Sequence, residues 1–441
     1  MNRGLVTGKN CVRAGLVFAS ASVLLGSLVS VEAFGGVLSL HHRKDAPGNA
    51  EAKKGPTASQ PPAFSIPVEP LGFYAPGPYY LGQRESLVSL DFLDENRLLF
   101  TFRAPGLIHR STTGDTERQI RAVVLILPQG GLETEALWTL HDHDRYLWML
   151  HGGRFLLRDE NTIKEGDPKL ELRPMLEFPG PLLSVEMDPE QRYLVTNSLE
   201  PASVESKKGQ VDSPQTAAAD ISADHQEDSG RRDIVVRILD RASGQVMLVS
   251  RVRAPVHLPI NGDGYVESLP GKPREWVLSF DAFRGGSKLL GTVDSSCQPP
   301  IEFVSHDEAL VNTCIFQNGR RLIALSTQGR KLWDAESPPT QIWPLFVISP
   351  DGSRLARETL TVDHSIEDFG HAFDAQDIKG QWVEVFDAVG GKLRLQAPVS
   401  PVLDGGGNVA ISPSGKLVAI LNAGAIEVYS LGQPEAMSPK P

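Results

Sequence analysis

Apolar and polar positions recur along this chain in one short phrase: an apolar residue, a turn residue four positions on, and an apolar pair at positions seven and eight. The phrase is clearest in Ile348–Ala356, with Gly352 at the turn, and in Ile411–Ala419, with Gly415 at the turn. An apolar strand, a tight turn and an apolar return strand predict a β-hairpin. One hairpin cannot bury its own apolar face, so repeated hairpins predict an architecture in which neighbours stack.

The phrase aligns at seven places, most of them about 45 to 48 residues apart, which is the spacing of a small repeated unit. The two longer spacings each contain an insertion. A second hairpin follows in several units, as in Ile234–Met247 and Trp382–Leu393. Two hairpins in sequence make a four-stranded meander. The first residues of the seven units are Phe92, Leu140, Met187, Leu258, Phe303, Ile348 and Ile411.

With these units the chain resembles the WD40-like and YVTN-type β-propellers, and the turn Ser349–Gly352 also resembles the repeat of TolB-type propellers. The resemblance covers roughly residues 65–431 and implies an all-β fold, a seven-bladed propeller of four-stranded antiparallel blades. The last unit ends one strand short after Ala425–Tyr429, whereas Phe64–Leu71 is extended and unassigned. We therefore expect this N-terminal segment to complete the last blade and close the ring, which protects strand edges.

The N-terminal residues predict export. Basic residues precede the apolar stretch Ala14–Ser30, and Val31–Ala33 offers small residues for cleavage, so residues 1–33 are interpreted as a signal peptide. The alternative is an uncleaved membrane anchor. Residues 34–63 are expected to form a disordered linker, 64–432 the propeller and 433–441 a disordered tail. The expected location is periplasmic or extracellular, with no transmembrane span in the mature chain.

Two cysteines, Cys297 and Cys314, remain after the predicted signal peptide. In an exported protein a pair of cysteines predicts a disulfide. The register of the hairpin that turns at His306 and Asp307 places Cys314 opposite residue 299, two positions from Cys297. Such a bridge would stabilise the fold by about 3 kcal/mol in the chain-entropy account. The alternative is two free thiols.

Composition and motifs narrow the function. A formal net charge of −11 argues against a nucleic-acid partner, because phosphate binding requires a basic face. The sequence has no Gly-x-Ser-x-Gly, His-Glu-x-x-His, phosphate-loop or Cys-x-x-Cys motif. We therefore expect no cofactor, no metal and no catalytic residue, and we expect a monomer.

Three insertions separate the second and third strands of their units, at Arg103–Gln119, Pro201–Arg232 and Val362–Lys379. Connections of this type all emerge on one face of a propeller, and loops on a rigid scaffold carry recognition. They therefore predict a binding face. The alternative is tolerated surface insertion, which we favour for Pro201–Arg232 because that stretch is polar and lacks aromatic residues.

The sixth-unit insertion contributes the candidate residues of this binding face. Imidazole and carboxylate side chains together can bind a divalent cation, and on a helical turn some of these residues would share a face. The spacing fits no standard metal signature, so an acidic, solvated loop is the favoured interpretation. The residues are His364, Glu367, Asp368, His371 and Asp374. The stretch His141–Asp144 is interpreted as the tight turn of the second hairpin, where Asp and His cap backbone groups.

These observations predict an exported, non-catalytic propeller that binds a protein or ligand partner, or acts as a scaffold, through the face with the long loops. This step rests on analogy between folds. The alternative is a propeller enzyme, a lactonase-like hydrolase or a quinoprotein-like dehydrogenase, with its site at the mouth of the central channel. Polar residues that converge there would favour the enzyme. A third reading is an assembly role at the cell envelope, with the linker as a tether.

Overall fold

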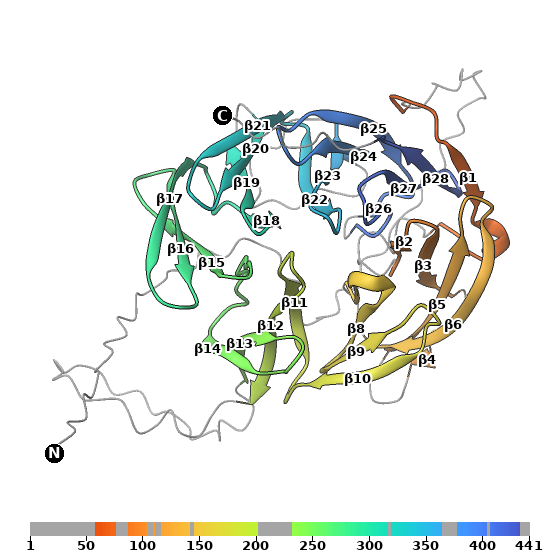
Figure 1. The fold of residues 1–441 in the computed structure, drawn as a ribbon, viewed down its shortest axis with the longest axis horizontal. Helices are drawn as coiled ribbons and strands as arrows, with labels where there is room; N and C mark the ends of the chain where they lie inside the picture. The colour runs from red at the N-terminus through yellow and green to blue at the C-terminus, as the bar shows by residue number, and fades with distance from the viewer. Residues whose placement is uncertain are drawn as a thin grey trace, which may run out of the picture.

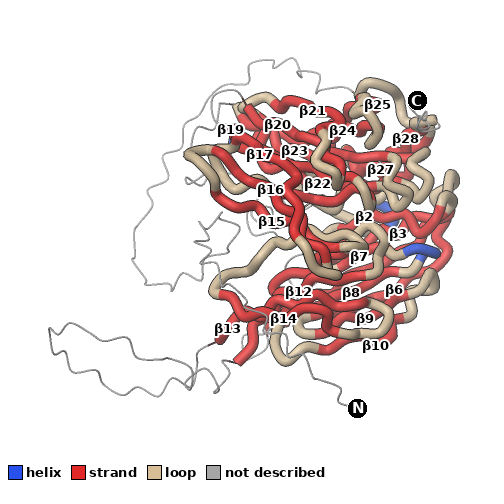
Figure 2. Tube along the Cα trace, turned by 60° about the vertical axis from the view of Figure 1, so that its left-hand side comes forward, coloured by secondary structure: helices blue, strands red, loops and turns tan. Residues whose placement is uncertain are grey.

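Seven antiparallel sheets stand around one axis and form a seven-bladed β-propeller (Figure 1). The predicted all-β architecture is therefore confirmed. The computed structural model describes residues 58–75, 87–104, 109–110, 116–141, 145–201, 232–315, 319–363, 377–403 and 406–432. Two short 3-10 turns, Glu69–Leu71 and His151–Gly153, are drawn in blue among the strands of Figure 2.

Blades 1 to 3 are four-stranded meanders whose first strand is innermost. Blade 1 consists of β2 (Ser89–Asp94), β3 (Arg97–Arg103), β5 (Thr116–Ile126) and β6 (Gly131–Leu140), with β4 (His109–Arg110) paired to β5. Blade 2 consists of β7 (Leu147–Met149), β8 (Phe155–Asp159), β9 (Thr162–Gly166) and β10 (Leu172–Glu177). Blade 3 consists of β11 (Leu182–Met187), β12 (Tyr193–Pro201), β13 (Arg232–Asp240) and β14 (Val246–Val252).

Blades 4 to 7 continue the ring, and in Figure 1 the inner strands β18, β22 and β26 lie nearest its centre. Blade 4 contains β15 (Gly264–Pro270), β16 (Glu275–Ala282) and β17 (Ser287–Asp294). Blade 5 contains β18 (Ile301–Ser305), β19 (Glu308–Ile315), β20 (Gly319–Ser326) and β21 (Lys331–Ser337). Blade 6 contains β22 (Gln341–Ile348), β23 (Arg354–Val362), β24 (Ile378–Asp387) and β25 (Leu393–Val399). Blade 7 contains β26 (Val409–Ile411), β27 (Leu417–Asn422), β28 (Ala425–Ser430) and β1 (Phe64–Pro67).

The innermost strand of blade 4 is reduced to one bridge, between Ile260 and Tyr265. The backbone NH of Val266 still donates to the carbonyl of Pro259 at 3.0 Å, so the predicted hairpin is present in outline. The segment ahead of the bridge contains Pro255 and Pro259. Proline has no NH to donate to a strand ladder, which explains the short pairing. The inner pairing of blade 4 is therefore shorter than that of its neighbours.

The sequence alignment was wrong in the second unit. Leu140 ends β6, the outer strand of blade 1, where it lies opposite Arg118. The inner hairpin of blade 2 is instead formed by β7 and β8, with Leu147 opposite Leu157. Leu140 is fully buried, as the first residue of a correctly aligned unit would be, and it lies seven positions before the apolar residue Leu147. It therefore matches the repeat pattern although it belongs to the preceding blade. The stretch His141–Asp144 is thus part of the connection between blades 1 and 2 and not a hairpin turn, and residues 142–144 lie outside the described part of the chain.

Strand β1 closes the ring as predicted. It pairs antiparallel with β28, with Phe64 opposite Val428 and Ile66 opposite Ile426. Ile66 and Val68 are 4% and 1% exposed and belong to the apolar cluster between blades 7 and 1. An N-terminal strand therefore completes a sheet whose other three strands come from the C-terminal end of the propeller.

Truncating the closing strand is expected to destabilise the protein. Ile66→Ala removes a buried side chain from the cluster between the first and last blades, at an expected cost of about 2–5 kcal/mol. Ser65→Ala is the matched control, since Ser65 is the exposed neighbour and surface changes of this kind stay within about 0.5 kcal/mol. Urea unfolding of both variants measures the difference. Equal midpoints for the two variants would show that β1 does not hold the ring closed.

The predicted disulfide is present between Cys297 and Cys314, whose Cα atoms are 5.5 Å apart. The bridge joins the segment that enters blade 5 to β19, the second strand of that blade. The same two segments are joined by a hydrogen bond from the backbone NH of Cys314 to Ser295 Oγ, at 2.9 Å. The disulfide that was predicted from the hairpin register is therefore confirmed, and it joins the connection between blades 4 and 5 to blade 5.

A buried ionic cluster joins blades 6 and 7. Arg354, at the start of β23, is fully buried and forms an ion pair with Asp387, which is 2% exposed. Its Nε donates to the carbonyl of Gly415 in the hairpin turn of blade 7 at 3.2 Å. Gly415 has a φ of +67°, and a Cβ there would lie 2.6 Å from Arg354 Cγ, so the close approach requires glycine. Arg394 donates from Nε to the other oxygen of Asp387 at 2.6 Å.

Candidate functional site

The sequence-predicted binding residues His364, Glu367, Asp368, His371 and Asp374 all lie outside the described residues, so their arrangement stays a prediction. The structure does show where their loop is anchored. It connects β23, which ends at Val362, to β24, which begins at Ile378, the second and third strands of blade 6. At the base of the loop Lys379 Nζ lies 2.8 Å from Asp363 Oδ2.

The two faces of the propeller differ in the length of their connections. All second-to-third strand connections lie on one face, which we call the long-loop face. There the segments 104–115, 202–231 and 363–377 join strands in blades 1, 3 and 6. In blades 2, 4 and 7 the same connection is a short turn, and in blade 5 only three residues separate the two strands. On the opposite face the connections from first to second and from third to fourth strands are described throughout, and each spans only a few residues.

A second group of polar side chains gathers about the propeller axis, and we call it the axial cluster. It consists of ionisable residues from blades 1 to 5. Three are carboxylates on inner strands of blades 1, 3 and 5, one is a histidine on the inner segment of blade 4, and one is an arginine just ahead of β7. The residues are Asp91, Glu186, Glu302, His257 and Arg145.

His257 joins three blades within the axial cluster. Its Nδ1 lies 2.9 Å from Glu186 Oε1 in blade 3, and its Nε2 lies 2.6 Å from the carbonyl oxygen of Ile301 in blade 5. The side chain of His257 is 52% exposed, and its partial desolvation between the blades would lower the pKa of this imidazole. The charge and hydrogen bond of Glu186 outweigh burial and raise the pKa of His257 to about 9. The ring is therefore an imidazolium at neutral pH.

The carboxyl groups of Glu302 and Asp91 titrate close to neutrality. Burial raises the pKa of Glu302 to about 7, opposed by the positive charges of His257 and Arg145. Burial raises the pKa of Asp91 to about 6, opposed by the hydrogen bond from Ser89 and again by Arg145. Arg145 of blade 2 thus acts on a group in blade 1 and on one in blade 5. Blades 2 and 5 are not neighbours, so these groups face one another about the axis.

Arg145 is held in place by its own blade. Its Nε donates to the carbonyl of Leu147 at 3.3 Å, and its guanidinium lies 5.4 Å from the centroid of the Trp148 ring. A cation over an aromatic face is stabilised by the ring quadrupole. The axial cluster therefore combines a fixed cation, an imidazolium–carboxylate pair and two carboxyl groups that exchange protons near pH 7. Perturbed groups of this kind favour a binding or proton-transfer site.

No standard motif marked the axial cluster, but a positional signal does. Asp91, Glu186, His257 and Glu302 each directly precede the first apolar residue of their repeat unit, which is Phe92, Met187, Leu258 or Phe303. Successive side chains of a strand point to opposite faces. The apolar residue packs into the blade interface, and the preceding position occupies the same level of each blade. Comparing this one position across the units would have identified four of the five residues.

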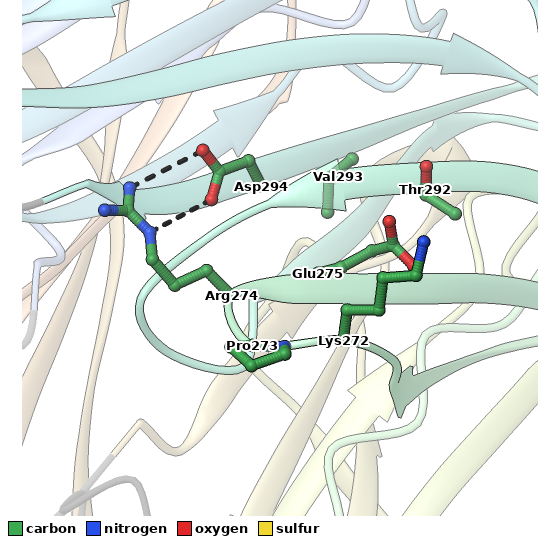
Figure 3. Close-up of a pocket in the computed structure, with 7 residues that line it drawn as sticks. All are labelled: Lys272, Pro273, Arg274, Glu275, Thr292, Val293 and Asp294. Atoms are coloured by element: carbon green, nitrogen blue, oxygen red, sulfur yellow. Dashed lines mark hydrogen bonds and ion pairs between the residues drawn. The ribbon is translucent and has the colours of Figure 1, made fainter.

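Metal chemistry has no support among the described residues. They contain no group of three or more His, Cys, Asp or Glu side chains arranged to hold a metal ion. A shallow pocket lies on the long-loop face of blade 4, lined by Lys272–Glu275 and Thr292–Asp294 (Figure 3). Its one ion pair, Arg274 Nε to Asp294 Oδ1 at 3.2 Å, is made by exposed side chains. The described chain also contains no helix long and apolar enough to cross a membrane.

The chain was compared with protein families, curated proteins and solved structures. No protein-family model matches the sequence, and no curated protein matches it. The fold is similar to acylaminoacyl peptidase from Pyrococcus horikoshii, at 12% identity and a TM-score of 0.44, over 80% of this chain and 53% of that chain. It is also similar to the β-propeller domain of the Trilobed protease from Pyrococcus furiosus, at 10% identity and a TM-score of 0.42, over 80% of this chain and 99% of that chain. The chain thus spans about half the length of the peptidase.

Proposed function

We propose that this β-propeller is a non-catalytic binding or scaffold module that takes a protein or ligand partner on the long-loop face. The carrying observation is the asymmetry of the two faces. On one face, three blades have long connections between their second and third strands. On the opposite face, every connection between strands of the same blade is a short turn. A rigid ring that varies only on one side is what a recognition scaffold requires.

The proposal includes export from the cell and a monomeric chain, as the N-terminal sequence and the closed ring suggest. The partner is not a nucleic acid, because the chain carries a formal net charge of −11. The disulfide between Cys297 and Cys314 is compatible with an oxidising compartment. The residues of the sixth-blade loop, His364 to Asp374, belong to the proposed contact surface.

Photo-crosslinking from two ends of one blade tests the proposal. A crosslinking amino acid replaces Pro201, exposed at the long-loop end of β12, or Ser243, exposed in the turn between β13 and β14 on the opposite face. Incubation with extract of the source cells should give one defined adduct from position 201 and none from position 243. Equal labelling from both positions, or none from either, would contradict recognition through the long-loop face.

An enzyme with a site about the axis is the second candidate, and the axial cluster favours it. Glu302, with a pKa of about 7, has the protonation range of a general acid or base at neutral pH. A panel of lactone and ester substrates tests this candidate directly. Turnover that is lost in Glu302→Gln but retained in the exposed control Glu171→Gln would show that the protein is a hydrolase and would contradict the proposal of a non-catalytic binding module. No turnover above the buffer rate would leave the binding module.

A further inference from the structure

Two histidine side chains join blade 4 to its neighbours, one near each face of the ring. His257 lies on the inner segment of blade 4 and reaches Glu186 Oε1 in blade 3 at 2.9 Å and the Ile301 carbonyl in blade 5 at 2.6 Å. The second histidine, His306, lies near the opposite face, in the hairpin turn of blade 5. Its Nδ1 lies 2.9 Å from Glu190 Oε1 in blade 3, and its Nε2 lies 3.1 Å from Asp263 Oδ2 in blade 4.

The backbone of the same turns supports the His306 contacts. The side-chain amide of Asn261 in blade 4 donates to the carbonyl of His306 at 2.8 Å. The backbone NH of Gly262 donates to Glu190 Oε2 at 3.2 Å. One glutamate of blade 3 therefore accepts from both blade 4 and blade 5, and the three hairpin turns form one connected network.

Each ring presents both of its nitrogens to oxygen atoms that only accept hydrogen bonds. For His257 the acceptors are a carboxylate and a backbone carbonyl, and for His306 they are two carboxylates. A neutral imidazole carries a single NH, whereas an imidazolium carries two. Both contacts of each ring can therefore be satisfied only in the protonated state. Loss of one proton leaves one nitrogen lone pair facing an oxygen lone pair.

The acidic groups around both rings act in the same direction. Glu186 and Glu302 face His257, with Arg145 beyond Glu302, and the pKa of His257 is raised to about 9 because Glu186 outweighs burial. The acidic side chains that face His306 are Glu190, Asp263 and Asp307. They outweigh its burial and raise its pKa above the usual value. Behind Glu190 lies the buried Asp188, whose own pKa burial raises to about 7.

Blade 4 has a further polar contact at its inner segment, because the side chain of Asn197 in blade 3 donates to the carbonyl of Val256 and accepts from the NH of Val256, both at 3.0 Å. Its inner strand is reduced to the bridge between Ile260 and Tyr265. Apolar packing also holds this segment, because Leu258 and Ile260 share a cluster with Tyr193 of blade 3, while Leu278 shares one with Phe303 of blade 5. Weakening the two histidine contacts should reduce the polar contacts between blade 4 and its neighbours, while the rest of the ring keeps its packing.

We propose that blade 4 is a proton-controlled segment of the ring, closed against blades 3 and 5 while His257 and His306 each donate two hydrogen bonds, and loosened when these rings become neutral. The opening exposes the inner segment Val256–Ile260 and the edges of its two neighbours. This inference does not depend on the proposed binding function, since it concerns only contacts between blades.

Hydrogen exchange of the full chain tests the proposal. Amide protection, corrected for the intrinsic rate at each pH, is compared at pH 6 and pH 9.5 for blade 4 and for β27 and β28 of blade 7. The expected result is a loss of protection of about tenfold in β15–β17, with little change in blade 7. In the double variant His257→Gln, His306→Gln the pH dependence of blade 4 should disappear, while the exposed control His151→Gln behaves as the natural chain.

A second measurement keeps the proposal testable if the double variant does not fold. Nitrogen NMR of the natural chain reports whether each imidazole carries one or two protons. Both rings should show two protonated nitrogens at pH 6 and lose one as blade 4 loses protection. A single-proton tautomer at pH 6 on either ring would overturn the proposal. So would blade 4 protection that stays constant across the titration.

Discussion

Arg354→Ala is expected to destabilise the protein by about 3–5 kcal/mol, the usual cost of breaking a buried ion pair by removing one partner. The guanidinium is fully buried, and Asp387 would lose this cation while keeping its contact with Arg394. The same change removes the hydrogen bonds from Arg354 to the carbonyls of Gly415 and Gly432, at 3.2 and 3.4 Å, which join blade 6 to the last blade. The substitution therefore weakens the interface between blades 6 and 7 as well as the sheet of blade 6.

Urea unfolding of the purified chain measures this effect. Arg192→Ala is the control, because Arg192 also pairs with an aspartate, Asp240 at 3.5 Å, but its side chain is 62% exposed. Exposed pairs contribute about 0–1 kcal/mol, so the control should unfold close to the natural chain. If Arg354→Ala unfolds at the same midpoint as Arg192→Ala, the buried cluster does not hold the two blades together.

The second large effect concerns pH: the protein is expected to be more stable at pH 5.5 than at pH 8. Burial raises the pKa of Glu358 to about 8 and that of Glu308 to about 7. In the unfolded chain these groups lose their protons near pH 4.5. Between that value and the folded pKa the native state binds more protons than the unfolded state, so stability falls as pH rises.

Other titratable groups do not reverse the expected fall in stability between pH 5.5 and pH 8. His257, with a pKa raised to about 9, contributes stability below pH 6.5 that is lost as pH rises through 9. Glu200 has the opposite sign, because its pKa is lowered by Arg237 and Ser198 against its burial, and its contribution is lost only in more acidic solution. Comparing pH 5.5 with pH 8 therefore excludes that opposing effect.

Thermal unfolding at the two pH values measures the difference, and a fall in Tm of about 5 °C or more is expected from pH 5.5 to pH 8, since each kcal/mol corresponds to a few degrees. Glu358→Gln should reduce this difference, because the amide keeps a neutral partner beside Gln381 and cannot ionise. Glu171→Gln, at a 63% exposed position, is the control and should leave it unchanged. A Tm that rises toward pH 8 would contradict the assignment of Glu358 as a buried neutral acid.

The repeat phrase was sufficient for the architecture because blade interfaces demand apolar residues at fixed positions. It predicted the seven-bladed ring, the closing strand at Phe64 and the bridge between Cys297 and Cys314, all of which depend on register. It failed at Leu140, where a buried residue of one blade lies at the right spacing from the next. Periodicity reports burial and cannot tell which sheet buries a residue.

The polar contacts were harder to predict for a physical reason. The axial cluster depends on side chains from five blades that meet only when the ring closes. No short motif brings Asp91, Arg145 and Glu302 together. The pairing of His306 with Glu190 likewise joins residues of blades 3 and 5 across a third blade. Sequence spacing describes local hairpins well, whereas these contacts depend on the rotation from one blade to the next.

The closing strand also has a consequence in time. Strand β1 is synthesised before every other strand, yet its partner β28 is the last strand of the propeller to be made. At about 5–20 residues per second, the first strand waits on the order of tens of seconds for its partner to appear. Pairings between such distant segments form slowly because loop closure comes first. The propeller therefore cannot close until its last strand has been synthesised.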